Sequence, residues 1–383
     1  MLVWAREEAG FTHEELANKL HITVDRFKQW EDTGKNIPLG MLKIVANHYK
    51  RQLAVFCLPT PPPKVIKPND FRNLAKDQSG LSNEVLLTVR RTNKYLNLAC
   101  ELEGDEYWKT KYKWLNDTDT LFNTKKKIID TEILTWLRKI LNISVYQQKK
   151  SRSYDIAFKS WRNAIEKKLG IFVFQFPMPE NELDGFSYAF KPPFAIVINS
   201  SNKLPQRKIF TLFHELGHIL KHQSGLCYTD LYRDNQLDLE FECNDFAGKF
   251  LIPDSNVYPI DSIEELTRLS QTYKVSREVY LRRSFESELI SKKEFFSYLK
   301  GIRETSKTKK PKKVSGPVNH SVISRSQRGE TFYNMVIDAA YKNRIEFSTA
   351  SDNLNLNINI ILNALGRQRT FRCKDKKIIF QDN

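Results

Sequence analysis

Apolar residues recur at helical spacing over most of the chain, and one central region departs from that pattern. Its three short apolar runs are expected to be strands: Gly170–Pro177, Gly185–Phe190 and Phe194–Ser200. Helices are expected around residue 214 and over about 238–251, where Pro253 ends the second one. Strands followed by helices predict an α+β fold with a small β-sheet.

The sequence pattern of residues 1–50 predicts four short helices. Thr12 with Glu15 forms a capping-box pattern, and Thr23 is a second candidate N-cap after a short turn. Two short helices across a tight turn make a helix-turn-helix, and this region resembles the Xre/Cro-like domains of phage repressors. Side chains on its second helix would face a DNA major groove, namely Asp25, Arg26, Lys28 and Gln29. Residues 1–50 carry seven Lys/Arg and seven Asp/Glu, so a protein-contact module is the alternative.

The rest of the chain divides by composition. We expect a helix-turn-helix module over 1–60, a helical linker region over 61–150, a core over 151–260 and a helical C-terminal region over 261–383. The Pro-rich Pro59–Pro63 marks the first boundary, and a long helix is predicted over Asn83–Leu102. Core aromatics of the second region are expected to be Trp108, Trp114 and Trp136. A small hairpin is expected over Thr370–Phe380.

Composition is that of a globular chain, with 40% hydrophobic and 28% charged residues. We expect a cytoplasmic protein without membrane spans, because no long apolar run, no signal-peptide pattern and no CxxC pair among the five cysteines occurs. The net charge is +16. Residues 303–328 carry eight Lys/Arg and one acid, so they are a flexible connector or an electrostatic handle for nucleic acid or an acidic partner.

The segment His214-Glu215-Leu216-Gly217-His218 carries the most specific chemistry. Residues four apart lie on one helix face, so His214 and His218 can direct two imidazoles at one zinc ion. Glu215 can act on a water molecule as general base without binding the metal. The apolar flanks are those of a buried helix, in which histidines need partners, and two satisfied core histidines are the alternative.

A catalytic zinc site needs a third protein ligand. Four acids on the next helix are candidates: Asp238, Glu240, Glu242 and Asp245. A His–His–Glu set from two helices resembles the gluzincin arrangement, whose glutamate precedes by four residues an Asp or Asn that orients a ligand histidine. Glu240 and Asn244 have that spacing, so we choose Glu240 as ligand, with Asn244 supporting it and Glu242 as the second choice. We expect His222 at the surface.

The stretch Phe210–Leu220, together with Glu240–Pro253, resembles the ImmA/IrrE metallopeptidases. In this sequence Cys243 stands where that family usually has alanine. The resemblance implies a gluzincin-like zinc endopeptidase, fused to an N-terminal Xre-type helix-turn-helix. It also implies a protein substrate, such as a transcriptional repressor or regulator of a mobile element, stress or defence system.

Three points stay open. The residue that stabilises the oxyanion is unassigned, with Tyr228 and Tyr232 in the loop between the helices as candidates. The strand Gly185–Phe190 is either ordinary sheet or an exposed edge that binds substrate by β-augmentation. The chain as a whole is alternatively a DNA-binding regulator or antitoxin-like interaction protein with a structural or degenerate metal site. The presence of Glu215 argues against that alternative, because a purely structural site does not need the acid.

Overall fold

The first part of the structure is a small helical module with a core of its own. The computed structural model describes residues 1–49, 51, 53–62, 81–115, 131–189, 191–202, 204–221, 226–228, 238–306 and 319–364. The module consists of α1 (Leu2–Ala9), α2 (His13–Leu20), α3 (Val24–Thr33), α4 (Leu39–His48) and the 3₁₀ helix η1 (Leu53–Cys57). Thr12 and Glu15 form the predicted capping box of α2, and Thr23 caps α3. Phe27 and Trp30 of α3 are buried in this core.

The centre of the molecule is a four-stranded mixed sheet. Its strands are β1 (Phe172–Phe176), β2 (Leu183–Tyr188), β3 (Ala195–Asn199) and β4 (Leu226–Tyr228), in the spatial order β1-β3-β2-β4. β1 runs parallel to β3, and β2 is antiparallel to both β3 and β4. Every residue of β1, β2 and β3 is buried, as expected where helices cover both faces of a sheet.

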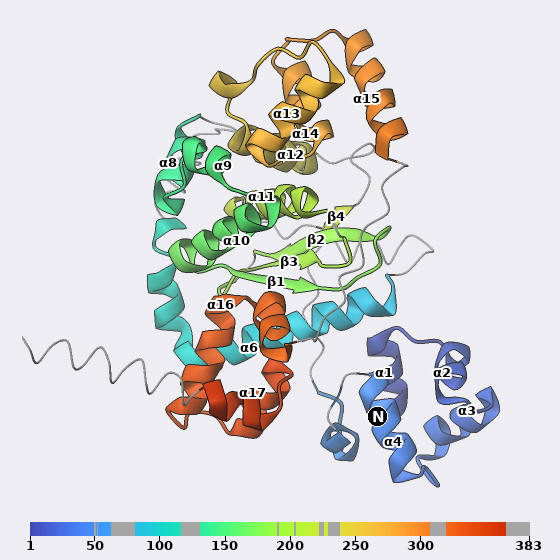
Figure 1. Cartoon of the computed structure of the whole chain (residues 1–383). Coiled ribbons are helices and arrows are strands. Elements are labelled where there is room, and N and C mark those ends of the chain that lie inside the picture. Colours follow the sequence, from blue (N-terminus) through green and yellow to red (C-terminus); the bar gives the residue numbers. More distant parts are fainter. Residues whose placement is uncertain are drawn as a thin grey trace, which may run out of the picture.

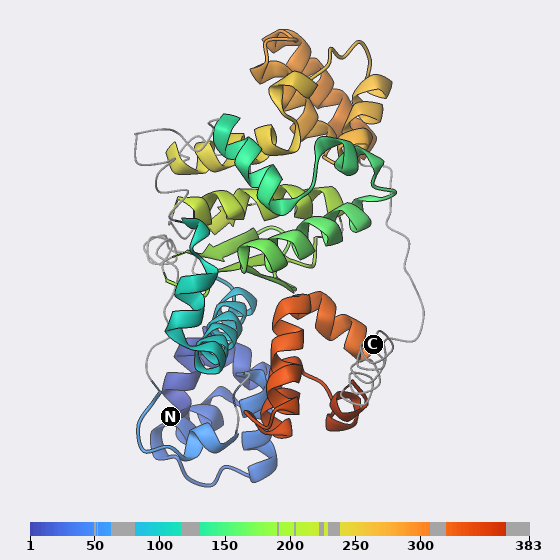
Figure 2. The same cartoon turned by 90° about the vertical axis from the view of Figure 1, so that its left-hand side faces the viewer.

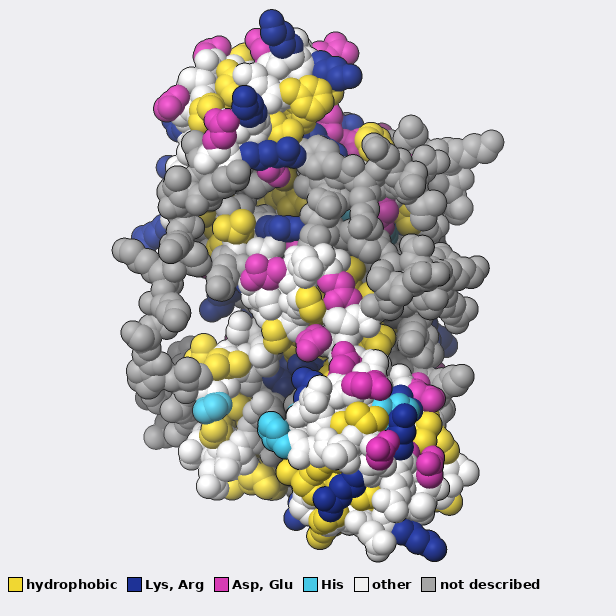
Figure 3. All heavy atoms as spheres, turned by 90° about the vertical axis from the view of Figure 1, so that its right-hand side faces the viewer, with side chains coloured by type: hydrophobic (Ala, Val, Ile, Leu, Met, Phe, Trp, Pro, Cys, Tyr) yellow, Lys and Arg dark blue, Asp and Glu magenta, His cyan; other side chains and the backbone are white. Residues whose placement is uncertain are grey.

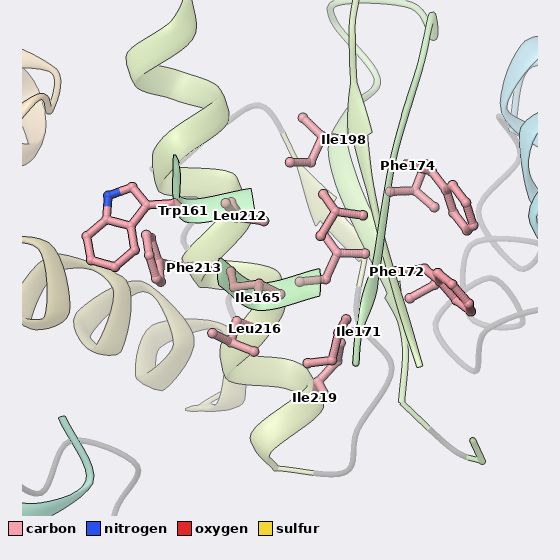
Figure 4. Close-up of a cluster of buried hydrophobic side chains, with 14 of the residues drawn as sticks. Trp161, Ile165, Ile171, Phe172, Phe174, Ile198, Leu212, Phe213, Leu216 and Ile219 are labelled. Atoms are coloured by element: carbon pink, nitrogen blue, oxygen red, sulfur yellow. The ribbon is translucent and has the colours of Figure 1, made fainter. Parts of the chain in front are cut away.

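One face of the sheet is covered by α10 (Tyr154–Ala164), its π-helical extension η2 (Ile165–Leu169) and α11 (Pro205–Leu220). Leu212, Leu216 and Ile219 of α11 point toward the sheet, where Ile198 faces them (Figure 4). Trp161 and Phe213 lie on the other side of α11 and pack edge to face, with ring centroids 4.9 Å apart. α11 is therefore anchored on two sides by apolar contacts.

The opposite face is covered by segments far apart in the sequence (Figures 1 and 2). These are α6 (Asn83–Lys111), which is interrupted at Gly104, and α16 (His320–Tyr341), which is followed by α17 (Phe347–Leu354). The ring centroid of Phe332 in α16 lies 5.6 Å from that of Phe174 in β1 and 4.7 Å from that of Tyr95 in α6. The C-terminal helices thus belong to the same core as the sheet.

A further layer lies beyond α11 (Figure 1). It contains α12 (Asp238–Leu251), η3 (Asp254–Asn256), α13 (Ile263–Tyr273), α14 (Arg277–Glu286) and α15 (Lys292–Ser306), with α8 (Thr131–Leu141) and α9 (Val145–Lys150) beside it. Among the ranges given above, no helix combines the length and apolar character needed to cross a bilayer.

The structure refines several expectations. The long helix predicted over Asn83–Leu102 continues to Lys111, and β2 begins two residues before the predicted Gly185. Trp108 and Trp114 are buried and Trp136 is partly buried, as expected of core aromatics. The hairpin expected over Thr370–Phe380 lies outside the described residues.

The ends of the basic stretch 303–328 are helical, because Arg303 belongs to α15 while Arg325 and Arg328 belong to α16. Arg328 is buried and donates to the carbonyl oxygen of Asn353, so its guanidinium serves the fold rather than a partner. The five lysines of the stretch lie outside the described residues.

Candidate metal centre

The helix α11 carries the HExxH segment in its buried second half. All residues from Thr211 to Leu220 are buried, and His214 and His218 are only 1% and 0% exposed. The two imidazoles face each other, with their Nε2 atoms 3.1 Å apart. Helical i, i+4 geometry therefore produces the convergence expected from the sequence.

Helix α12 approaches α11 closely at Gly217. A Cβ atom at position 217 would lie 3.2 Å from Cys243 Sγ and 3.3 Å from Phe246 Cδ1. Glycine therefore costs some helix propensity but lets the two helix axes come together. Cys243 faces this contact, and the close packing delivers Glu240, one turn earlier on α12, to the histidines.

The Glu240 carboxylate meets both imidazoles. Its Oε2 lies 3.2 Å from His214 Nε2, and its Oε1 lies 3.1 Å from His218 Nε2. Burial raises the pKa of Glu240, but hydrogen bonds and charge interactions with the two histidines outweigh burial and lower the pKa to about 2. The carboxylate is therefore ionised at neutral pH, as a metal ligand must be.

These three side chains form a group whose ligand atoms all lie within 4.8 Å of one another. Tetrahedral zinc with bonds of about 2.0–2.1 Å separates its ligand atoms by roughly 3.3 Å. The two Nε2 atoms are 3.1 Å apart, and each lies 3.1–3.2 Å from a different oxygen of the Glu240 carboxylate, close to that value. Two imidazole nitrogens and a carboxylate form a donor set that zinc accepts. The His214, His218 and Glu240 cluster can thus bind a metal ion.

Asn244 contacts His214 on the side of the imidazole ring that faces away from the cluster. Its Oδ1 lies 3.0 Å from His214 Nδ1, and its side chain is buried. An amide oxygen only accepts hydrogen bonds, so the Nδ1–H tautomer is favoured and the Nε2 lone pair is directed at the cluster. Asn244 is thus placed where the sequence spacing predicted a supporting residue.

Glu215 is fully buried against the sheet. A Cβ atom at Gly185 of β2 would lie 3.6 Å from Glu215 Cγ, 2.8 Å from Thr211 Cγ2 and 2.6 Å from the carbonyl oxygen of Val197. Gly185 therefore leaves the room in which Thr211 and Glu215 of α11 approach β2. The sequence marked Gly185 only as the start of a strand, although an isolated glycine beside a strand is itself a signal of close approach.

The other acids of α12 have different partners. Glu242 pairs with Lys221 at 2.7 Å and Asp245 pairs with Lys249 at 2.9 Å, while the Asp238 side chain lies outside the description. Glu242, the second choice for a metal ligand, is therefore held away from the histidines. His222 and Tyr232 lie outside the described residues, and for Tyr228 only the backbone, within β4, is described.

The idea that Gly185–Phe190 is an exposed edge strand is wrong. β2 lies between β3 and β4, and all its residues are buried. β4, a strand of three residues within the connection from α11 to α12, was not predicted from the sequence. β4 pairs with β2 from Leu183 to Phe186 and so covers that part of its edge.

A partly buried ion pair near the cluster was not predicted from the sequence. Asp184 of β2 accepts from Arg207 Nε at 2.8 Å and from Asn202 at 3.3 Å. Burial raises the pKa of Asp184, while Arg207, Asn202 and the nearby His214 lower it. This pair ties the first turn of α11 to the sheet. Asp184 follows Glu180, Asn181 and Glu182, so the sequence does not distinguish it from a surface acid.

The residues proposed for DNA contact lie on the surface of α3. Arg26, Lys28 and Gln29 are all exposed, and the Arg26 guanidinium lies 5.6 Å from the ring centre of Trp30. Acidic and basic side chains are interspersed on the face of this module that Figure 3 presents. Among the described residues of the module on that face, Lys and Arg side chains do not gather into one strongly basic patch of the kind that neutralises a phosphate backbone.

Comparison with protein families gives one match to this part of the chain. Residues 166–285 match the family model Peptidase_M78, described as the IrrE N-terminal-like domain. Searches of curated proteins and of solved structures gave no match. The matched segment contains His214, His218, Glu240 and Asn244, so it supports the resemblance to the ImmA/IrrE family and points to a metallopeptidase-type function.

Proposed function

We propose that this chain is a zinc-dependent endopeptidase whose metal is held by His214, His218 and Glu240. The observation that carries the proposal is the convergence of two imidazole nitrogens and one carboxylate within 3.1–3.2 Å, in a cluster supported from behind by Asn244. A structural zinc site closes with a fourth protein ligand. Among the described His, Cys, Asp and Glu side chains, the group has three members.

When bound, the zinc ion would polarise the scissile carbonyl and acidify a water molecule. Glu215 follows His214 directly, and its side chain is fully buried. We assign it the role of general base, which takes a proton from the attacking water and delivers it to the leaving amine. We propose that Tyr228 or Tyr232, in the connection between α11 and α12, stabilises the oxyanion.

The substrate class we propose is a protein, and specifically a transcriptional repressor or regulator of a mobile element, stress or defence system. This assignment rests on the ImmA/IrrE resemblance of residues 166–285. Zinc as the metal rests on the donor set, since two imidazoles and a carboxylate in tetrahedral spacing suit that ion.

The test uses a pair of chains that differ at the general base. Wild-type protein and Glu215→Gln, which preserves the size and burial of the side chain, are expressed at equal levels in the same cells. New protein N-termini are then identified by terminal labelling and mass spectrometry. We expect termini that appear only with the wild type, and identical sets of termini from both strains would refute the proposal.

The alternative, a DNA-binding regulator with a structural or degenerate metal site, draws on the exposed Arg26, Lys28 and Gln29 of α3. Lys28→Ala and Arg26→Ala should then weaken binding to duplex DNA, and the loss of phosphate contacts should flatten its dependence on salt. Binding of duplex DNA that both substitutions leave intact would argue against this role for α3. Antitoxin-like behaviour would instead appear as stable association with a partner that Glu215→Gln does not alter.

A further inference from the structure

A surface cavity opens between α9 and α10, away from the residues of the metal cluster. It has a volume of about 330 Å³ and forms where the chain turns between the two helices at Ser151. Its lining includes Ile143, Tyr146, Lys150, Ile156, Ser160 and Trp161. We refer to it as the α9–α10 cavity.

The cavity has an apolar floor and apolar rims. Trp161, which is 1% exposed, closes the floor, while Tyr146 and Ile156 at the rims are 68% and 49% exposed. Single exposed apolar side chains are normal on protein surfaces. Two of them beside a cavity that ends on a buried indole form a receptacle for another apolar side chain.

The surroundings of the cavity are basic. Residues 138–152 contain five Lys/Arg and no acid. Arg138 is directed inward, where it donates to the Ile143 carbonyl and to Gln148, but Lys139, Lys150 and Arg152 are exposed. Lys150 lines the cavity, with its Nζ 5.5 Å from the ring centre of Tyr146. Asp155 of α10 is a nearby exposed acid, and Lys159 on the same helix offsets it.

We propose that the α9–α10 cavity binds an acidic segment of a partner protein, with one large apolar side chain inserted over Trp161. The lysines and Arg152 complement the acidic segment, and the walls of Ile143 and Ile156 complement the inserted side chain. The cavity has one exposed ring, that of Tyr146, because Trp161 is buried at its floor. A single exposed ring gives no platform for a series of stacked bases, so a polypeptide fits this site better than a nucleic acid.

The residue at the floor of the cavity packs against the helices that carry the metal cluster. The Trp161 ring packs edge to face on Phe213 at 4.9 Å and on Phe250 of α12 at 5.4 Å. Phe213 immediately precedes His214. A partner side chain on Trp161 would therefore rest on the same packed core that carries α11 and α12. The binding itself requires no hydrolysis, so it can be tested independently of the proposed activity.

The probe is a short fluorescein-labelled peptide of Glu and Asp residues with one central Phe. Its binding to the full chain is measured by fluorescence anisotropy. Matched probes are the same peptide with Ser in place of Phe, and a labelled single-stranded DNA of similar charge. Ile156→Ser and Lys150→Glu alter the cavity, while Val322→Ser on α16 and Lys293→Glu on α15 are exposed controls.

We expect the Phe peptide to bind and the Ser peptide to bind roughly tenfold more weakly, the change that about 1.4 kcal/mol of lost apolar burial produces. Ile156→Ser and Lys150→Glu should each weaken the Phe peptide by a similar factor, and the two controls should leave it unchanged. Equal binding of both peptides, preference for the DNA, insensitivity to Ile156→Ser or absence of binding would each overturn the proposal.

Discussion

The side-chain oxygen of Asn244 lies 3.0 Å from Nδ1 of His214, on the side of the ring opposite the metal cluster. This contact fixes which ring nitrogen carries the proton, because the amide oxygen can only accept. Loss of such a partner typically lowers metal affinity roughly 10–100-fold. We therefore expect Asn244→Ala to bind zinc more weakly by that factor, as measured by competition with a chromogenic chelator.

Asn244→Asp is the matched control for this substitution. A carboxylate keeps the hydrogen-bond acceptor, so zinc affinity should stay near that of the wild type. If Asn244→Ala and the wild type bind zinc equally well, the contact has no role in orienting His214. Circular dichroism of each variant separates a metal-binding defect from loss of fold.

Gly185 should not tolerate even one added methyl group. A Cβ there would lie 2.6 Å from a backbone oxygen of β3 and 2.8 Å from Thr211 of α11, and neither element can shift without disturbing the packing of the sheet. Overpacking of this kind typically costs about 1–3 kcal/mol. We expect Gly185→Ala to lower the free energy of unfolding by that amount in urea denaturation.

Gly40 in α4 supplies the contrast, since among the described residues no atom beyond its chain neighbours and its own helix backbone lies within 4 Å of the position its Cβ would take. Gly40→Ala should be neutral or should stabilise the N-terminal module by up to about 1 kcal/mol through helix propensity. Equal effects of the two substitutions would mean that the close approach of α11 to β2 is incorrectly described.

Phe332 tests whether the C-terminal helices belong to the core. Its side chain is fully buried and packs on Phe172, Phe174 and Tyr95. Phe332→Ala should cost about 3–5 kcal/mol, a typical value for a buried phenylalanine, and should lower the melting temperature of the entire chain. Val322→Ala, at an exposed position of the same helix, should leave the melting temperature nearly unchanged. A separate melting transition for α16 and α17 would contradict this account.

Local rules predicted that the two histidines converge, and the resemblance to the gluzincin arrangement led to the choice of Glu240 and Asn244. His214 and His218 are related by helical periodicity, and Glu240 and Asn244 are again four residues apart on one helix. The capping box of α2 and the ends of α12 follow from equally local signals. Gly217 permits the close approach of α11 and α12. The sequence shows the glycine within the helix but does not indicate this contact.

Contacts between segments far apart in the sequence could not be predicted from such local signals. No periodicity in residues 320–341 indicates that Phe332 covers β1, and no pattern in a three-residue segment reveals that β4 covers the edge of β2. Arg328 shows the same limit. Its place in a basic stretch suggested exposure, but its side chain is buried, donates to the Asn353 carbonyl and the Gln327 side chain, and lies 5.5 Å from the ring centre of Tyr95. Such contacts depend on which distant segments meet, and local propensity carries little information about that choice.

The central claim is that two histidines and Glu240 bind one metal ion. Its most direct test is the zinc content of purified protein, measured by inductively coupled plasma mass spectrometry after reconstitution and removal of loosely bound metal. We expect about one zinc ion per chain in the wild type and in Glu215→Gln, and little in Glu240→Ala or His214→Ala that remain folded by circular dichroism. Zinc retained equally by Glu240→Ala and His214→Ala, or absent from the reconstituted wild type, would contradict the account.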